Sequence, residues 1–348
     1  MHLLNIKMKQ TLVLGIETSC DETGVALYEL GKGLKAHKLY SQIKMHAEYG
    51  GVVPELASRD HVRKLIPLIR ELFNENKLSL DAISAIAYTK GPGLSGALLV
   101  GTTVANTLGY ALRTPVIGIH HLEAHLLSPL LSNPEIIFPF IALLVSGGHT
   151  QIIRVDQIGN YKILGDTRDD AAGEAFDKTG KILGLPYPGG ALLSQLATHG
   201  DATKYPLPKP MLNSGDLDFS FSGLKTAVAQ LVRKLDAEVV LRSDVMKADI
   251  AASFQKSVTD VLTAKCCAAL RVDDVSSLVV AGGVGANTEL RRKINQASKK
   301  VGFRVYYPPI EFCTDNGAMV ALVGALRVTE GASGALPFNI RPRWPLNT

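Results

Sequence analysis

Two histidines one helical turn apart are the side chains of this chain best suited to bind a metal ion. His121 and His125 lie four residues apart. On a helix of about 3.6 residues per turn they project from one face, about 40° apart. Two imidazoles placed in this way can bind one transition-metal ion. Two unrelated histidines can show the same spacing, so the pair alone leaves both interpretations open.

Glu123 restricts the kind of metal chemistry. Zinc peptidases use the pattern His-Glu-x-x-His, in which the general-base Glu directly follows the first His. Here Glu123 follows His121 by two residues, so it points about 200° around the helix from that histidine. A base that faces away from the metal cannot activate metal-bound water. The pattern therefore favours a metal that orients a ligand or neutralises its charge over one that hydrolyses peptides.

Composition predicts a globular chain that works inside the cell. The 348 residues are 46% hydrophobic and 20% charged, which allows a sizeable core and two domains or two lobes. No apolar run reaches the roughly 20 residues of a membrane helix, so no membrane partner is expected. Four cysteines without a Cys-x-x-Cys pair fit a reducing cytoplasm. A net charge of +5 is compatible with a polyanion such as RNA.

Strand-like and helix-like segments alternate, as in α/β proteins. Strands are expected at 11–16, 25–30, 83–88, 116–119, 140–145, 151–155, 277–281 and 304–308, and helices at 61–76, 97–112, 289–301 and 318–328, with another from His121. The order strand, polar turn, strand occurs at 11–30 and again at 140–155, which suggests a repeated unit. A polar linker at 132–135 then divides the chain into lobes at 1–134 and 135–348.

Three glycine-bearing turns follow predicted strands, at 18–24, 146–150 and 282–287. Glycine lets a backbone approach a ligand closely, and free N–H groups can cradle phosphate. Each turn alone is commonplace. Two hairpin turns together with a Gly-Gly loop that opens a helix match the two-lobed fold of actin, Hsp70 and the sugar kinases, the ASKHA fold. In that plan residues 282–287 hold the adenosine and ribose, and Asp21 lies near the phosphates.

Two further carboxylates have both a structural and a functional interpretation. The segment 168–178 is rich in acidic residues and reads as an ordinary capped helix start, but Asp177 and nearby Gly190 could hold a ribose diol or an amino-acid group. Asp315 could cap the helix that follows it. It could instead complete a set of two histidines and one carboxylate, which would place a metal ion between the lobes.

Taken together, the motifs resemble those of the TsaD family, the bacterial tRNA threonylcarbamoyltransferases once labelled O-sialoglycoprotein endopeptidases. The resemblance runs in order from residue 12 to residue 346. One local departure is Ala124, where many members have glycine. The motifs are Glu-Thr-Ser-Cys-Asp-Glu-Thr at 17–23, Gly-Pro-Gly-Leu at 91–94, His-His-Leu-Glu-Ala-His at 120–125, Val-Ser-Gly-Gly-His-Thr at 145–150, Phe-Ser-Phe-Ser-Gly-Leu-Lys at 219–225, Gly-Gly-Val-Gly-Ala-Asn at 282–287, Thr-Asp-Asn at 314–316 and Arg-Pro-Arg-Trp at 341–344.

The resemblance implies a reaction and a set of residues. The threonylcarbamoyl group of threonylcarbamoyl-adenylate moves to N6 of the adenosine beside the anticodon, in tRNAs that read codons beginning with A, and AMP leaves. Iron, or alternatively zinc, is held by His121, His125 and Asp315. Asp21 matches an acidic residue on the phosphate side. Family partners are the TsaB paralogue and the TsaE ATPase. The implied substrate contacts are Leu144, Val145, Ser146, Gly147, Gly148, Asp177, Gly190 and Asn287.

The mechanism expected from this site needs no nucleophilic side chain. A metal ion can polarise the carbonyl of the mixed anhydride and neutralise the departing phosphate, so the adenosine amine can attack directly. A non-catalytic ATP-binding scaffold and a metallopeptidase are the alternatives. The basic residues Arg291, Arg292, Lys293, Lys299 and Lys300 are either a tRNA footprint or an ordinary exposed helix face. The extension at 1–7 matches nothing in the family.

Overall fold

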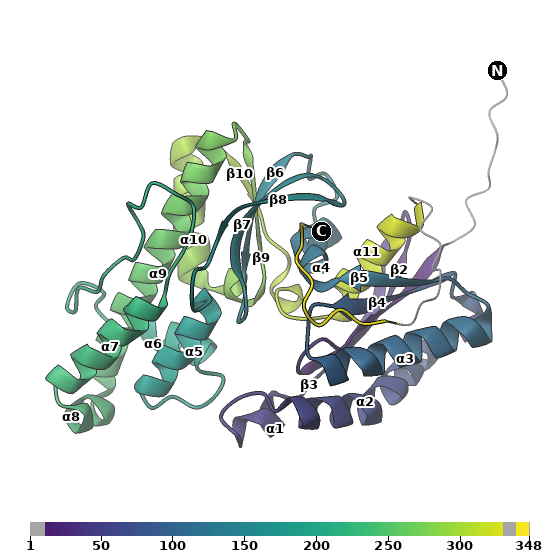
Figure 1. The fold of residues 1–348 in the computed structure, drawn as a ribbon, viewed down its shortest axis with the longest axis horizontal. Coiled ribbons are helices and arrows are strands. Elements are labelled where there is room, and N and C mark those ends of the chain that lie inside the picture. The colour runs from purple at the N-terminus through teal and green to yellow at the C-terminus, as the bar shows by residue number, and fades with distance from the viewer. Residues whose placement is uncertain (1–10, 330–338, 348) are drawn as a thin grey trace.

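The computed structural model describes residues 11–329 and 339–347 of the chain, and the extension at 1–7 lies outside them. Figure 1 shows two β-sheets with helices on their outer faces and further helices between them. No helix in the described part is long and apolar enough to cross a membrane.

The first sheet has the strand order β3-β2-β1-β4-β5. β1 pairs antiparallel with β2 and parallel with β4. All six residues of β1 are buried, as expected for a central strand with both faces covered. The strands are β1 (Leu12–Glu17), β2 (Glu22–Glu29), β3 (Gly33–Ser41), β4 (Ala85–Gly91) and β5 (Val116–His120).

The second sheet repeats the topology of the first. Its order, read from the other edge, is β8-β7-β6-β9-β10. β6 pairs antiparallel with β7 and parallel with β9, as β1 does with β2 and β4. The strands are β6 (Phe140–Val145), β7 (Thr150–Gln157), β8 (Asn160–Asp166), β9 (Ser277–Ala281) and β10 (Arg304–Tyr306). The repeat suggested by the sequence is therefore present in the fold.

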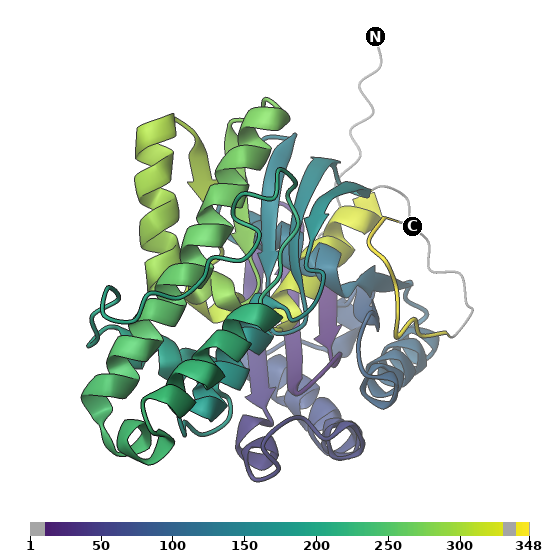
Figure 2. The same cartoon turned by 60° about the vertical axis from the view of Figure 1, so that its left-hand side comes forward.

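Helices complete each layer. α2 (Pro54–Glu75) and α3 (Ser95–Leu112) pack on the first sheet, and Figure 2 shows α9 and α10 running along the second sheet. The remaining helices of the second half are α5 (Ala172–Ile182), α6 (Gly189–Ala197), α7 (Ser222–Lys234), α8 (Ala237–Arg242), α9 (Asp244–Val272) and α10 (Thr288–Val301). The short ones elsewhere are α1 (Ile43–Ala47), η1 (Leu80–Ala82), η2 (Ser128–Leu131), η3 (Gly283–Ala286) and η4 (Ile310–Phe312).

Two helices lie between the sheets. α4 (His121–Leu127) continues from the end of β5, and α11 (Gly317–Thr329) packs against β1, β2 and β4 although it comes from the far end of the chain. Their apolar side chains join residues of both sheets in one core, which contains Val13, Ala87, Leu122, Leu144, Val279 and Met319. The carboxyl ends of β1, β5, β6 and β9 therefore face a common space, and the candidate site lies there.

Candidate active site

Three side chains that could hold one metal ion meet between the sheets. The ligand atoms of His121, His125 and Asp315 all lie within 4.8 Å of one another. Both histidines are on α4, whereas Asp315 stands in the turn before α11. His125 Nε2 lies 2.9 Å and His121 Nε2 3.5 Å from the same oxygen, Asp315 Oδ1. The structure thus brings together the three side chains that the sequence selected, from segments 190 residues apart.

Glu17, at the end of β1, orients the first of these histidines. Its Oε2 lies 3.2 Å from His121 Nδ1, and the fully buried carboxylate also accepts bonds from the Ser19 amide and the Thr89 hydroxyl. Because a carboxylate only accepts, Nδ1 carries a hydrogen, and Nε2 is left facing Asp315 Oδ1 at 3.5 Å. In the metal-free protein a second proton on the ring supplies the positive charge between Nε2 and the carboxylate, and a bound metal ion can take its place. The arrangement fits a metal ion, with Glu17 as the supporting carboxylate.

Opposite charges within the triad stabilise each other. Burial lowers the pKa of His121, but the carboxylates of Asp315 and Glu17 outweigh burial and raise that pKa to about 9. Burial raises the pKa of Asp315, yet His121 and His125 hold it well below its usual range. Asp315 is therefore a carboxylate at neutral pH, and a positive charge beside it is stabilised.

Glu123 takes no part in this triad. Its side chain is 4% exposed. Its Oε1 accepts a hydrogen bond from Tyr161 Oη at 2.6 Å and pairs with Arg327. These partners belong to β8 and α11, so the carboxylate points away from the triad, as the helix geometry predicts.

The loop at 18–21 is held on three sides. The consecutive carbonyls of residues 19–21 accept hydrogen bonds from Leu94 N–H at 2.8 Å, His61 Nε2–H at 2.9 Å and Gln42 N–H at 3.0 Å. These donors belong to α2 and to the residues that precede α3 and α1. This clamp fixes the segment that follows Glu17, and with it the position of Asp21.

Acidic groups crowd the same loop. Burial, with the carboxylates of Asp315 and Asp21, raises the pKa of Glu22 to about 10. Burial and the same two carboxylates also raise the pKa of the Cys20 thiol far above its usual range. A thiol that resists ionisation is a poor nucleophile, which agrees with a mechanism that forms no covalent enzyme intermediate.

A cavity of about 600 Å³ adjoins the triad. Its size is typical of a pocket for a nucleotide-sized ligand. Four of the predicted substrate residues line it, namely Gly147, Asp177, Gly190 and Asn287, and Thr314 forms the wall next to Asp315. Leu144 and Val145 have side chains buried in the cores beneath it. Ser146 and Gly148 stand in the same turn as Gly147 and do not line the cavity.

Close approach between two glycine turns shapes the cavity floor. Gly282 has a φ of +92°, and a Cβ there would lie 2.4 Å from the Val145 carbonyl oxygen. Only glycine permits this contact. The turn after β9 is therefore pressed against the end of β6, which brings together the predicted loops at 146–150 and 282–287.

Asp177 and Gly190 meet across the cavity wall. Asp177 Oδ1 accepts the Gly190 amide hydrogen at 2.7 Å. Burial raises the pKa of Asp177, against the opposing effect of the amides of Gly190 and Gly189. The carboxylate keeps lone pairs free for a ligand diol or amine, so the expected pairing of these two residues is present.

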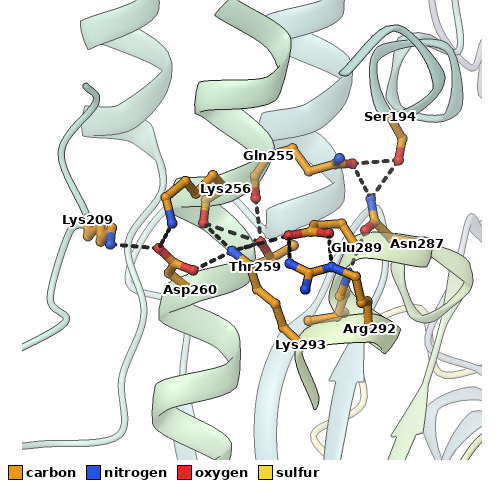
Figure 3. Close-up of polar contacts among 11 residues, drawn as sticks. Ser194, Lys209, Gln255, Lys256, Thr259, Asp260, Asn287, Glu289, Arg292 and Lys293 are labelled. Atoms are coloured by element: carbon orange, nitrogen blue, oxygen red, sulfur yellow. Dashed lines mark hydrogen bonds and ion pairs between the residues drawn. The ribbon is translucent and has the colours of Figure 1, made fainter. Parts of the chain in front are cut away.

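Asn287 is already engaged within the protein (Figure 3). Its Oδ1 accepts the Leu290 amide hydrogen and caps α10, while Nδ2 donates to Ser194 Oγ and to Gln255 Oε1, both at 2.7 Å. The side chain therefore joins α6, α9 and α10 at the cavity wall. Ser194 also lines the cavity, and no motif in the sequence pointed to this polar residue.

Most of the basic residues on α10 are also engaged within the protein. Lys293 pairs with Asp260, around which Lys209 and Lys256 gather, and Arg292 pairs with Glu289. Arg291 donates to the backbone oxygens of Gly285 and Pro308. Lys299 and Lys300 stand in the last turn, where positive charge favours the helix dipole. The tRNA footprint suggested for this helix stays a prediction, since Arg291 and Lys293 make internal contacts while Arg292, Lys299 and Lys300 are exposed.

Comparison with known families shows to which family the chain belongs. The profile described as "TsaD: tRNA N6-adenosine threonylcarbamoyltransferase" matches residues 33–322. The chain belongs to this family. A member from Herminiimonas arsenicoxydans is 59% identical over 340 residues, which cover 97% of this chain and 98% of the relative. One from Methylobacillus flagellatus is 58% identical over 335 residues, 96% of this chain and 98% of that protein. The chain is thus a transferase that modifies tRNA at N6 of adenosine.

Solved structures confirm the fold predicted for this threonylcarbamoyltransferase. Component A of (R)-2-hydroxyglutaryl-CoA dehydratase from Acidaminococcus fermentans superposes with a TM-score of 0.54 at 16% identity, over 92% of this chain and 99% of that one. Full-length HypF gives a TM-score of 0.56 at 13% identity, over 94% of this chain and 48% of HypF. Such low identities establish the two-lobed ASKHA fold and nothing more.

Proposed function

We propose that this transferase takes the threonylcarbamoyl group from threonylcarbamoyl-adenylate, with the nucleotide in the cavity and the reacting carbonyl beside His121, His125 and Asp315. The observation that carries this proposal is the wall that the two sites share, because Thr314 lines the cavity and the next residue is Asp315. A donor whose adenosine rests against η3 can therefore direct its mixed anhydride at the triad.

The triad is proposed to hold Fe²⁺, with Zn²⁺ as the alternative. Two imidazole nitrogens and one carboxylate suit either ion, and the approach of both Nε2 atoms to Asp315 Oδ1 supports the fit. A divalent ion supplies Lewis-acid polarisation and charge neutralisation when it is bound. Glu17 orients His121, and Asp315 contributes the ligand from the other side of the cleft.

The remaining roles belong to the chain itself. Asp177, Gly190 and Asn287 are proposed to position the donor, together with the backbone of 144–148, and Asp21 to lie on its phosphate side. The adenosine amine then attacks the carbonyl and AMP leaves. Two proteins of this fold were solved with nucleotide, HypF in a phosphate- and nucleotide-bound form and a dehydratase activator from Clostridium difficile with bound ADPNP. They support the proposal that this chain binds a nucleotide.

Membership of the family suggests partners and a location for this chain. We propose that the chain acts in the cytoplasm on tRNAs that read codons beginning with A, at the adenosine beside the anticodon. It would act there with a TsaB-type paralogue and a TsaE-type ATPase. Support for this proposal comes from the full-length identity to the threonylcarbamoyltransferases.

Metal analysis together with a transfer assay tests the proposal. His121→Ala combined with His125→Ala should abolish bound iron or zinc and nearly all transfer from threonylcarbamoyl-adenylate to unmodified tRNA, in the presence of the partner subunits. The exposed His199 provides a matched control, because His199→Ala should change neither quantity. Full metal content in the double variant would contradict the assigned ligands. A wild-type protein that binds nucleotide without transfer would favour the scaffold alternative.

A further inference from the structure

We infer that Lys90, Arg341 and Arg343 form a contact surface for the phosphate backbone of the tRNA substrate. The inference rests on the transferase activity and on the proposed position of the metal triad. It gives a role to the Arg-Pro-Arg-Trp motif at 341–344, which the cavity and the triad do not use.

The C-terminal segment returns to the first sheet. In Figure 1 its yellow trace runs between α3 and α4. The Arg341 amide donates to the Lys90 carbonyl at 2.8 Å, and the Gly93 amide donates to the Pro342 carbonyl at 3.2 Å. Gly91 has a φ of +153°, and a Cβ there would lie 1.9 Å from the Arg341 oxygen. The end of β4 is thus built to receive this segment.

This contact lies next to the metal triad. Gly91 on β4 is in register with His120 on β5, and His121 follows directly. His120 Nε2–H donates to the Trp344 carbonyl at 3.0 Å. Ligands of open α/β sheets bind beyond the carboxyl ends of the strands, so the C-terminal segment borders the place where the target adenosine must arrive.

Three cationic residues lie on this segment and on the strand end that it contacts. Arg341 and Arg343 are exposed and Lys90 is half-buried. Among the described residues, the ion pairs include none of these three. Burial lowers the pKa of Lys90, and the charge of Arg341 lowers it further. The like charges therefore repel each other, and an incoming anion would relieve that repulsion.

A polyanionic RNA backbone fits this surface better than it fits α10. The central basic residues of α10 are occupied by Asp260, Glu289 and backbone oxygens. Proteins position nucleic acids chiefly through phosphate contacts by lysine and arginine, and each contact releases counterions and makes binding depend on salt. When the target base enters the cleft, the phosphates on either side of it remain at the rim, where these cations stand.

Salt-dependent tRNA binding tests the inference. The variant combines Lys90→Gln with Arg343→Gln and leaves Arg341 in place, because its guanidinium stacks over the Trp344 ring at 4.8 Å. Lys299→Gln with Lys300→Gln is the matched control, since it removes the same charge elsewhere. Fluorescence anisotropy of the full-length protein with labelled, unmodified tRNA should show binding weakened on the order of tenfold. The slope of log K against log salt should fall by about one to two.

Each outcome decides the question. Metal content and AMP affinity should stay at wild-type values in both variants. The inference would be overturned if the test variant bound tRNA with the same affinity and the same salt slope as the wild type. It would also be overturned if the control variant lost as much tRNA affinity as the test variant, or if the wild type did not bind tRNA at the lowest salt. Metal analysis of the wild type tests the proposed metal site separately. An error in the proposed metal site can therefore be told apart from an error in the proposed tRNA surface.

Discussion

On α4, two positions along the helix separate His121, a proposed metal ligand, from the structural carboxylate of Glu123. Glu123→Gln should therefore keep the metal and most of the transfer activity, because glutamine can still accept the Tyr161 hydrogen bond. Glutamine lacks the negative charge that pairs with Arg327, and the loss of this ion pair should lower the free energy of unfolding by about 2 kcal/mol. Metal analysis, transfer kinetics and urea unfolding measure the three quantities.

The opposite result would change the chemical interpretation. A Glu123→Gln protein that keeps its metal but has lost transfer as completely as His121→Ala would make Glu123 a catalytic base. The contacts with Tyr161 and Arg327 would then have to break during turnover.

Gly283 offers a direct probe of the nucleotide cavity. A Cβ there would have Thr314 Cγ2, 4.0 Å away, as its nearest neighbour, so alanine fits the protein but protrudes into the cavity. Gly283→Ala should weaken AMP binding about tenfold and leave the free energy of unfolding nearly unchanged. Titration calorimetry checks the affinity. Gly285→Ala is the control, because its Cβ would face Val280 rather than the cavity. Equal affinities in both variants would place the nucleotide elsewhere.

The residues of the triad could be predicted from the sequence, whereas the roles of the residues that orient them could not. The triad belongs to short motifs whose residue types indicate metal binding, namely those that contain His121, His125 and Asp315. Glu17 lies in a quoted motif as well, but its role depends on its distance from a histidine 104 residues away. The capping role of Asn287 likewise appears only when α6 and α9 are in place.

At the scale of elements, predictions succeeded where burial was continuous. The strands at 140–145 and 277–281 were predicted to the residue, because both are wholly apolar or small and wholly buried. The sequence predicted neither β3 nor β8, which are edge strands with largely half-exposed residues and a weak apolar signal. Helix α2 begins at Pro54 rather than at residue 61, since its first turns carry polar residues.

The clamp on the loop at 18–21 should depend on pH through His61. Its Nε2–H donates to the Cys20 carbonyl and its Nδ1 accepts the Thr23 hydroxyl at 2.8 Å, which requires a neutral ring. Burial lowers the pKa of His61. A lowered folded-state pKa gives stability that is present above the unfolded value of about 6.5 and is lost as the pH falls below it.

His61→Gln keeps a donor for the loop but does not titrate. The wild type should be more stable than this variant by about 1 kcal/mol at pH 7.5, and the difference should shrink as the pH falls toward 5. Urea unfolding at several pH values measures it, and comparing the two proteins cancels the effects of the other histidines. His199→Gln, at an exposed site, should show no such trend. A difference that stays constant with pH would refute the neutral-ring clamp.

At the scale of the molecule, the two lobes are not separate along the chain. A division at residue 134 is proposed from the polar linker, and α11 nevertheless comes from the far end of the sequence to pack on β1, β2 and β4. The sequence could not predict this packing. Apolar periodicity indicates that a helix is buried, but it does not indicate which sheet the helix packs against. The core around α4 and α11 contains side chains from both sheets, so the lobes share part of their stability.

This shared core predicts cooperative unfolding. Met319 on α11 is fully buried within it, and Met319→Ala should lower the free energy of unfolding by about 2–5 kcal/mol. Fluorescence of Trp344, the single tryptophan, reports the region beside α4 because its ring packs on His120, whereas far-UV circular dichroism reports all helices. Both probes should shift together in urea and trace one transition. Two transitions, or a shift of the fluorescence midpoint alone, would show that the lobes unfold independently.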